Sequence, residues 1–323
     1  MQFAVFCIGG LNRAMLSKLR LEALDSISYR EIESTIPSAP ITAWTSAWTG
    51  VDPAVHGKVT GIKGRKPELN TIWDDLSRDG NKITIYNEGE WKKDDDVDIG
   101  IYKLDSMSDS IINGDIAQAQ ETLNSAMEMI EQVKDIPYLI ASAYGTAKYI
   151  TSLNVDNFLI ARSMIKMNAR GMEYENTIAY PANYTGKKPR ITYGIMLNSN
   201  KRIKGFMEER HVMTIQGNLM MILNDVKGVV AKPAHLQYDM AGEYYLDMPD
   251  IVLSSPSNMT CFRSVGGIQP DVLSLCYDYG LSSIGLIASN EPEIISGINT
   301  AMDIRKAIKR GYGKSTKKGT GSE

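Results

Sequence analysis

The chain has 323 residues, of which 43% are hydrophobic and 23% charged, and its formal net charge is -3 at pH 7. This balance is typical of a globular protein with a large core, and it excludes an overall basic surface for nucleic acid. The sequence has no apolar run long enough to cross a bilayer, no signal-peptide pattern and too few cysteines for a disulfide framework. It therefore predicts a cytoplasmic protein that binds neither nucleic acid nor membrane.

Strands and helices are predicted to alternate along the first half of the chain. An apolar run at 3–8 leads through Gly9-Gly10 into a helical pattern, which is the beginning of a βαβ unit. Strands are then predicted at 82–86, 97–104 and 137–141, and helices at 72–79, 115–133 and 157–169. This alternation predicts an α/β fold: a three-layer α/β/α sandwich with a mostly parallel central sheet.

The pattern changes after residue 173, where β-branched and aromatic residues alternate with Pro, Asn and Gly turns. This predicts a small antiparallel excursion, which the helical spacing at 212–226 extends to about residue 250. Further strands are predicted at 228–230, 251–254 and 284–288, and a last helix at 299–309. Because 311–323 consists mostly of Gly, Ser, Thr and Lys, the sequence predicts one domain at 1–310 and a disordered basic tail.

The most informative segment lies between residues 34 and 57. It contains Ala43-Trp44-Thr45-Ser46, then Thr49-Gly50, then Pro53-Ala54-Val55-His56-Gly57. This segment resembles the alkaline-phosphatase superfamily, and within it the type I phosphodiesterase/nucleotide pyrophosphatase branch. In that branch a helix has a Thr or Ser nucleophile at its N-terminal end, ends at Thr-Gly and is followed by Pro-x-x-His-Gly. Weaker similarities, such as Met248-Pro249-Asp250-Ile251, continue in the same order along most of the chain.

The resemblance implies a site at which two metal ions, usually zinc, are held by Asp and His and stabilise charge on a phosphoryl group. The first Asp ligand corresponds to Gly9, and the nucleophile, ten residues before Gly50, corresponds to Pro40. The paired Asp-His after the central strand corresponds to Ala143-Tyr144, and a late His falls in the region of Ser282 and Ser283. Most catalytic and metal positions of the branch are therefore lost.

Two features keep an active site open as an alternative. Thr42 and Ser38 carry hydroxyls close to Pro40, so a shift in register would offer either as a displaced nucleophile, although Ser38 is also placed to cap the helix. Asp105 and Asp109 match the branch's Asp-x-x-x-His spacing with a carboxylate in place of the His. They are interpreted as a weak site for a single magnesium ion or, with preference, as an acidic loop that caps the next helix.

Two functional interpretations follow. The favoured one is a pseudoenzyme that needs no cofactor and has a binding or scaffold role, with its partner either a small phosphorylated ligand or a protein. The alternative is a divergent metal-dependent phosphohydrolase or phosphodiesterase that acts on a nucleotide or another phosphoester. The pseudoenzyme would keep a vestigial site, composed of Gly9, Gly10, Pro40, Thr42, Ala143 and Tyr144.

Trp44 and Trp48 give a separate structural expectation. They are four residues apart in the helix predicted after Pro40, so they share one helix face. We expect this face to be buried against the sheet.

Overall fold

The structure is a computed structural model that describes residues 1–59, 69–104, 106–169, 171–182, 190–202, 204–256, 259–263 and 271–319. Its helices are α1 (Arg13–Leu16), α2 (Pro40–Thr49), α3 (Pro53–His56), α4 (Ile72–Arg78), α5 (Ser106–Ile112), α6 (Ile116–Gln132), α7 (Val155–Ala161), α8 (Glu209–Asn224) and α9 (Ile304–Gly319). Its strands are β1 (Phe3–Ile8), β2 (Ser28–Glu33), β3 (Ile83–Tyr86), β4 (Ile99–Leu104), β5 (Tyr138–Ser142), β6 (Gly145–Lys148), β7 (Thr151–Asn154), β8 (Met167–Asn168), β9 (Gly171–Met172), β10 (Ala179–Pro181), β11 (Thr192–Leu197), β12 (Val230–Pro233), β13 (Ile251–Ser254), β14 (Thr260–Arg263), β15 (Leu273–Leu275), β16 (Tyr279–Ser282) and β17 (Ile284–Ser289).

The central sheet has six strands in the order β2-β17-β5-β1-β4-β3. β1 pairs in parallel with β4 and β5, and β3 pairs in parallel with β4. β17 is antiparallel to both of its neighbours, β2 and β5. The predicted mostly parallel sheet is therefore confirmed.

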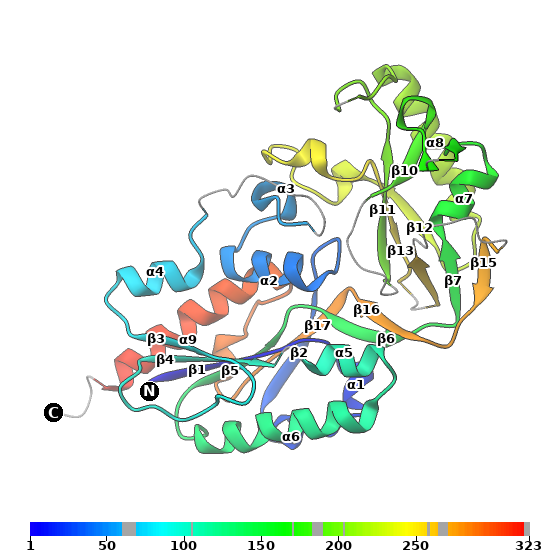
Figure 1. Ribbon diagram of the computed structural model, residues 1–323. Coiled ribbons are helices and arrows are strands. Elements are labelled where there is room, and N and C mark those ends of the chain that lie inside the picture. Colours follow the sequence, from blue (N-terminus) through cyan, green and yellow to red (C-terminus); the bar gives the residue numbers. More distant parts are fainter. Residues whose placement is uncertain are drawn as a thin grey trace.

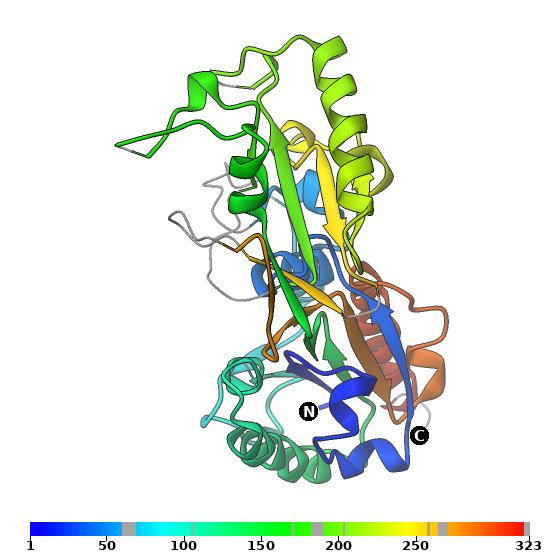
Figure 2. The same cartoon turned by 90° about the vertical axis from the view of Figure 1, so that its right-hand side faces the viewer.

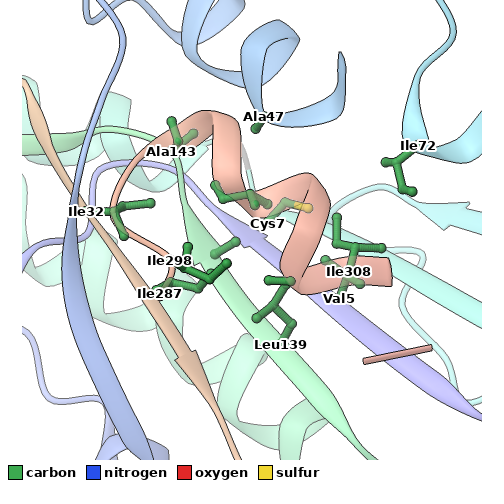
Figure 3. Packing of buried hydrophobic residues seen from close by; sticks show 14 of the residues in the cluster. Val5, Cys7, Ile32, Ala47, Ile72, Leu139, Ala143, Ile287, Ile298 and Ile308 are labelled. Carbon is green, nitrogen blue, oxygen red and sulfur yellow. The ribbon is translucent and has the colours of Figure 1, made fainter. Parts of the chain in front are cut away.

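Helices cover both faces of this sheet (Figure 1). Alternate residues of β1 point to opposite faces: Phe3, Val5 and Cys7 join the core beneath α2, α4 and α9, whereas Ala4, Phe6 and Ile8 join the core beside α1, α5 and α6. Figure 3 shows Val5, Leu139 and Ile308 packed between α9 and the sheet. Because both faces of the strands are buried, the apolar runs are nearly continuous. The three-layer α/β/α arrangement is confirmed.

A second lobe is built on an antiparallel sheet of order β10-β11-β13-β12. α7 and α8 pack against it in their own apolar cluster, which includes Phe158, Leu219 and Leu223. Figure 2 shows this lobe above the first, with β6 and β7 running between the two. The predicted excursion is thus a sheet of its own, and it also takes in β13. None of the described helices is long and apolar enough to span a membrane.

The last helix differs from the expectation. α9 continues through residue 319, so the expected disordered tail is wrong for residues 311–319, and residues 320–323 lie outside the described part of the chain. Gly311 lies against the Phe3 ring, and the Tyr312 phenol is hydrogen-bonded to Asn81. These contacts with distant parts of the chain keep a polar, glycine-containing segment helical.

Candidate functional site

The predicted vestigial site lies where parallel strands end. Gly9 and Gly10 follow β1, Ala143 and Tyr144 follow β5, and Pro40 is the first residue of α2. In open α/β sheets, the carboxyl ends of neighbouring strands form one edge, and sites are usually found there. Gly10 N donates a hydrogen bond to Tyr144 O at 3.1 Å, so the two loops are in direct contact. Asp105, one of the two predicted magnesium ligands, lies outside the described residues.

Hydroxyl side chains fix the two loops to each other. Ser142 Oγ accepts from the N–H of Leu11 at 3.0 Å and donates to Tyr144 O at 2.8 Å. Thr146 Oγ1 donates to Gly10 O at 2.9 Å. These buried hydrogen bonds preserve the backbone frame of the site without any metal ligand.

Tyr144 occupies the space beside Gly9. Its side chain is only 3% exposed, and its hydroxyl lies 3.1 Å from Ser108 Oγ, within hydrogen-bond distance. A Cβ placed on Gly9 would lie 2.4 Å from the Tyr144 hydroxyl oxygen, closer than real Cβ atoms approach. An Asp at position 9 and Tyr144 in this conformation are therefore mutually exclusive.

The donor set does not fit the pair of zinc ions that the fold implies. Gly9 and Ala143 have no side-chain donor, and a phenol such as that of Tyr144 is not among the usual zinc ligands. Ser282 Oγ accepts from Ile284 N at 3.2 Å within its own turn. Within the described ranges, no three or more His, Cys, Asp or Glu side chains are grouped so that they could hold a metal ion. We derive no chemical step through such a metal pair.

The two displaced nucleophile candidates are buried. The backbone N and Oγ of Ser38 each lie 3.1 Å from Thr192 Oγ1 in the second lobe, so Ser38 joins the lobes. Thr42 is fully buried, and its hydroxyl has no hydrogen-bond partner in the described part of the chain. A pocket opens nearby, between α2 and α5, and neither residue is among those that line it. Asp109 does line it, whereas its predicted partner Asp105 is not described, so the magnesium interpretation stays a prediction.

The Thr-Gly and Pro-x-x-His-Gly segments hold α2 in place. Gly50 ends α2 in the left-handed conformation, at a φ of 75°. His56 Nδ1 accepts from the N–H of Lys58 at 2.9 Å, so Nε2 carries the proton and donates to Ser46 Oγ at 2.8 Å. Burial is the main cause that lowers the pKa of His56 from 6.5 to about 4. A neutral, fully paired imidazole gives this segment a structural role.

A pocket of about 470 Å³ opens between α2 and α5. It is lined by Pro40, Ile41, Trp44, Thr45, Trp48, Ser108, Asp109 and Tyr144. We call it the α2–α5 pocket. Tyr144, which the resemblance matches to the His of the Asp-His pair, is among its lining residues.

The tryptophan face of α2 is only half-buried, which corrects the expectation of burial against the sheet. Trp44 and Trp48 stack on each other with ring centroids 4.8 Å apart, and they line the α2–α5 pocket. Smaller residues, such as Ala43 and Ala47, take the face of α2 that packs on the sheet.

Ser108 was also missed as a site residue. Its only signal in the sequence is its place directly before Asp109.

Known structures share this fold. Murine ectonucleotide pyrophosphatase/phosphodiesterase 5 aligns over 97% of this chain and 95% of its own, with a TM-score of 0.59 and 11% sequence identity, and an inactive form of it has been solved with AMP. Phosphonoacetate hydrolase from Sinorhizobium meliloti 1021, in complex with phosphonoacetate, aligns over the same shares with a TM-score of 0.61 and 11% identity. No protein-family model matches the sequence, and no curated protein matches it either. The chain therefore shares the fold of these proteins, an alkaline-phosphatase-like α/β/α sandwich.

Proposed function

We propose that this chain is a non-catalytic binding protein built on the alkaline-phosphatase-like fold, and that the α2–α5 pocket is its binding site. The observation that carries this proposal is the position of Tyr144, whose hydroxyl takes the space next to Gly9 and is paired with Ser108. The branch's chemistry needs carboxylate and imidazole donors at this point. A buried tyrosine there closes the space that they would use.

Several catalytic and metal-ligand positions that the resemblance implies differ at once. The first-strand position is Gly9, the nucleophile position is Pro40, and the Asp-His pair is Ala143-Tyr144. Pro40 is the first residue of α2, where a proline suits the helix start but offers no nucleophile. Restoring any single donor would leave the others missing, so weak activity from a nearly complete site is not expected.

The function is tested by measuring zinc binding and hydrolysis side by side. We expect no stoichiometric zinc binding by titration calorimetry, and no hydrolysis of a p-nitrophenyl phosphodiester or monoester above the buffer rate. The matched control is a double Asp105→Asn, Asp109→Asn variant, which removes the remaining carboxylates of the motif. Stoichiometric zinc, together with turnover that the double variant loses, would establish the divergent phosphohydrolase instead.

A further inference from the structure

Two of the three cysteines of the chain lie next to each other. Cys261 lies in β14 and is fully buried, and Cys276 directly follows β15 and is half-buried. Their sulfur atoms are 3.7 Å apart, although the two residues are separated by 15 positions in the sequence. A disulfide joins its sulfur atoms at about 2.05 Å, so these two sulfurs need to approach by about 1.7 Å to form one.

Strand pairing brings the two thiols together. The N–H of Cys276 donates a hydrogen bond to Ile150 O at 2.8 Å. β14 pairs in parallel with β7, and this pairing places Cys261 opposite Ser152. Both cysteines are therefore positioned by backbone contacts with the same short segment, residues 150–152.

An ion pair connects the same two segments a second time. Arg263 is two residues after Cys261, and Asp278 is two residues after Cys276. The guanidinium group of Arg263 and the carboxylate of Asp278 form a salt bridge. A variant that lacks one thiol therefore keeps a contact that holds these segments together.

The two cysteines belong to a small apolar cluster at the connection between the lobes. The cluster also contains Ala147 of β6, Tyr149 between β6 and β7, and Ile191, which directly precedes β11 of the second lobe. β6 and β7 run between the lobes (Figure 2). Because β14 and β15 flank β7 on either side, a bond between Cys261 and Cys276 would span this connecting strand.

We propose that Cys261 and Cys276 form a reversible disulfide when a small-molecule disulfide such as oxidised glutathione is present, and that this bond fastens the connection between the lobes. The thiolate of Cys276, the more accessible of the two, attacks the oxidised glutathione, forms a mixed disulfide and releases one glutathione. The sulfur of Cys261 then attacks the Cys276 sulfur and releases the second glutathione. The two cysteines lose two electrons and two protons, and one oxidised glutathione gains them.

The position of the thiols determines how fast the bond forms and what it does. Burial raises the pKa of Cys276 to about 11, so little of this thiol is ionised at neutral pH and the exchange is slow. Once formed, the bond restricts the unfolded chain between the two cysteines and so favours the folded state. These properties suit a lasting link between segments better than a rapid redox sensor.

The bond is tested on the full chain with oxidised glutathione at about pH 8.5, where more of the thiol is ionised. We expect the intact mass to fall by two hydrogen atoms and the number of free thiols to fall from three to one. A peptide map should show Cys261 joined to Cys276. The melting temperature of the oxidised chain should exceed that of the reduced chain by a few degrees, and dithiothreitol should reverse both changes.

Three single variants assign the reaction to its residues. Cys261→Ser and Cys276→Ser should each lose the mass change and the shift in melting temperature, and Cys261→Ser should retain glutathione on Cys276 as a mixed disulfide. The matched control is Cys7→Ala, which changes the third cysteine, in the core of the first lobe, and should keep both effects. A thermal melt of each reduced variant establishes that it is folded.

The proposed disulfide would be overturned if the natural chain kept all its thiols, carried only glutathione adducts, or joined either cysteine to Cys7. A disulfide that leaves the melting temperature unchanged would overturn its role in fastening the lobes. The peptide map of the natural chain decides the matter even if a serine variant does not fold. None of these measurements involves the α2–α5 pocket, so their failure leaves the proposed non-catalytic function standing.

Discussion

At the scale of single residues, His56 gives the segment that resembles a catalytic motif a structural role. Its ring joins Ser46 on α2 to the backbone of Lys58, and it is only 1% exposed. Losing either hydrogen bond would leave a buried polar group unpaired, which typically costs about 1–3 kcal/mol. The segment is therefore needed for packing, whatever chemistry takes place at the strand ends.

The lowered pKa of His56 predicts a dependence of stability on pH. The pKa is about 4 in the folded protein and near 6.5 when the ring is exposed, so the unfolded chain binds more protons between these values. His56 therefore favours folding fully above pH 6.5, and this contribution is lost as the pH falls toward 4, at up to about 1.4 kcal/mol per unit. The measurement is the free energy of unfolding in urea at several pH values.

The control for this prediction is His56→Gln, which can donate to Ser46 and accept from Lys58 without titrating in this range. The difference in stability between the natural chain and the variant should shift in favour of the variant as the pH falls from 6.5 to 4. Parallel pH profiles for the two proteins would contradict a buried, neutral His56.

At the scale of elements, α9 shows how a helix can continue through a segment of polar composition. Gly311 and Gly313 both lie inside α9, and glycine is unfavourable inside a helix. At Gly311 the absence of a side chain lets the helix approach the Phe3 ring, because an added Cβ would lie 2.3 Å from it. At Gly313 an added Cβ would meet nothing within 4 Å.

This contrast predicts opposite effects of two identical substitutions. Gly311→Ala should lower the free energy of unfolding by about 1–3 kcal/mol, because Phe3 is fully buried and cannot move aside. Gly313→Ala should leave stability unchanged or raise it by up to about 1 kcal/mol through helix propensity. Chemical denaturation measures both, and similar small effects at the two positions would mean that α9 does not pack on β1 beyond Arg310.

At the scale of the whole molecule, the two lobes are joined by buried polar contacts as well as by the strands between them. Ser38 precedes α2 in the first lobe, and Thr192 begins β11 in the second. Their side chains are buried, and the Thr192 hydroxyl lies 3.1 Å from both the backbone N and the Oγ of Ser38. A residue considered as a nucleophile from the sequence is therefore part of the connection between the lobes.

A double-mutant cycle measures this connection. Thr192→Val keeps the shape of the side chain but leaves the Ser38 N–H and hydroxyl without their partner, so we expect a loss of about 1–3 kcal/mol in the free energy of unfolding. In the Ser38→Ala background the same substitution should cost less, because one of the two unpaired groups is already gone. If the loss of stability in the double variant equals the sum of the losses in the two single variants, the two residues are not in contact.

The sequence by itself determined the layered fold and the meeting point of the site. Period-2 and period-3.6 patterns are local, and parallel strands bring their carboxyl ends to one edge, so the order of strands and helices is enough to place Gly9 and Tyr144 together. Pro40 was added to them by the family resemblance. It did not predict β2, because only Ile32 is buried in that edge strand and its pairing partner β17 lies more than 250 residues further along the chain.

Only the tertiary structure decided what these residues do. That the Tyr144 hydroxyl fills the space beside Gly9, that Trp44 and Trp48 line a pocket, and that α9 continues past Gly311 all depend on contacts between segments far apart in the chain. Local patterns record which face of an element is apolar, but not which distant side chain packs against it or how much room it leaves. The physical reason is that side-chain packing is three-dimensional, whereas propensity and periodicity act between near neighbours.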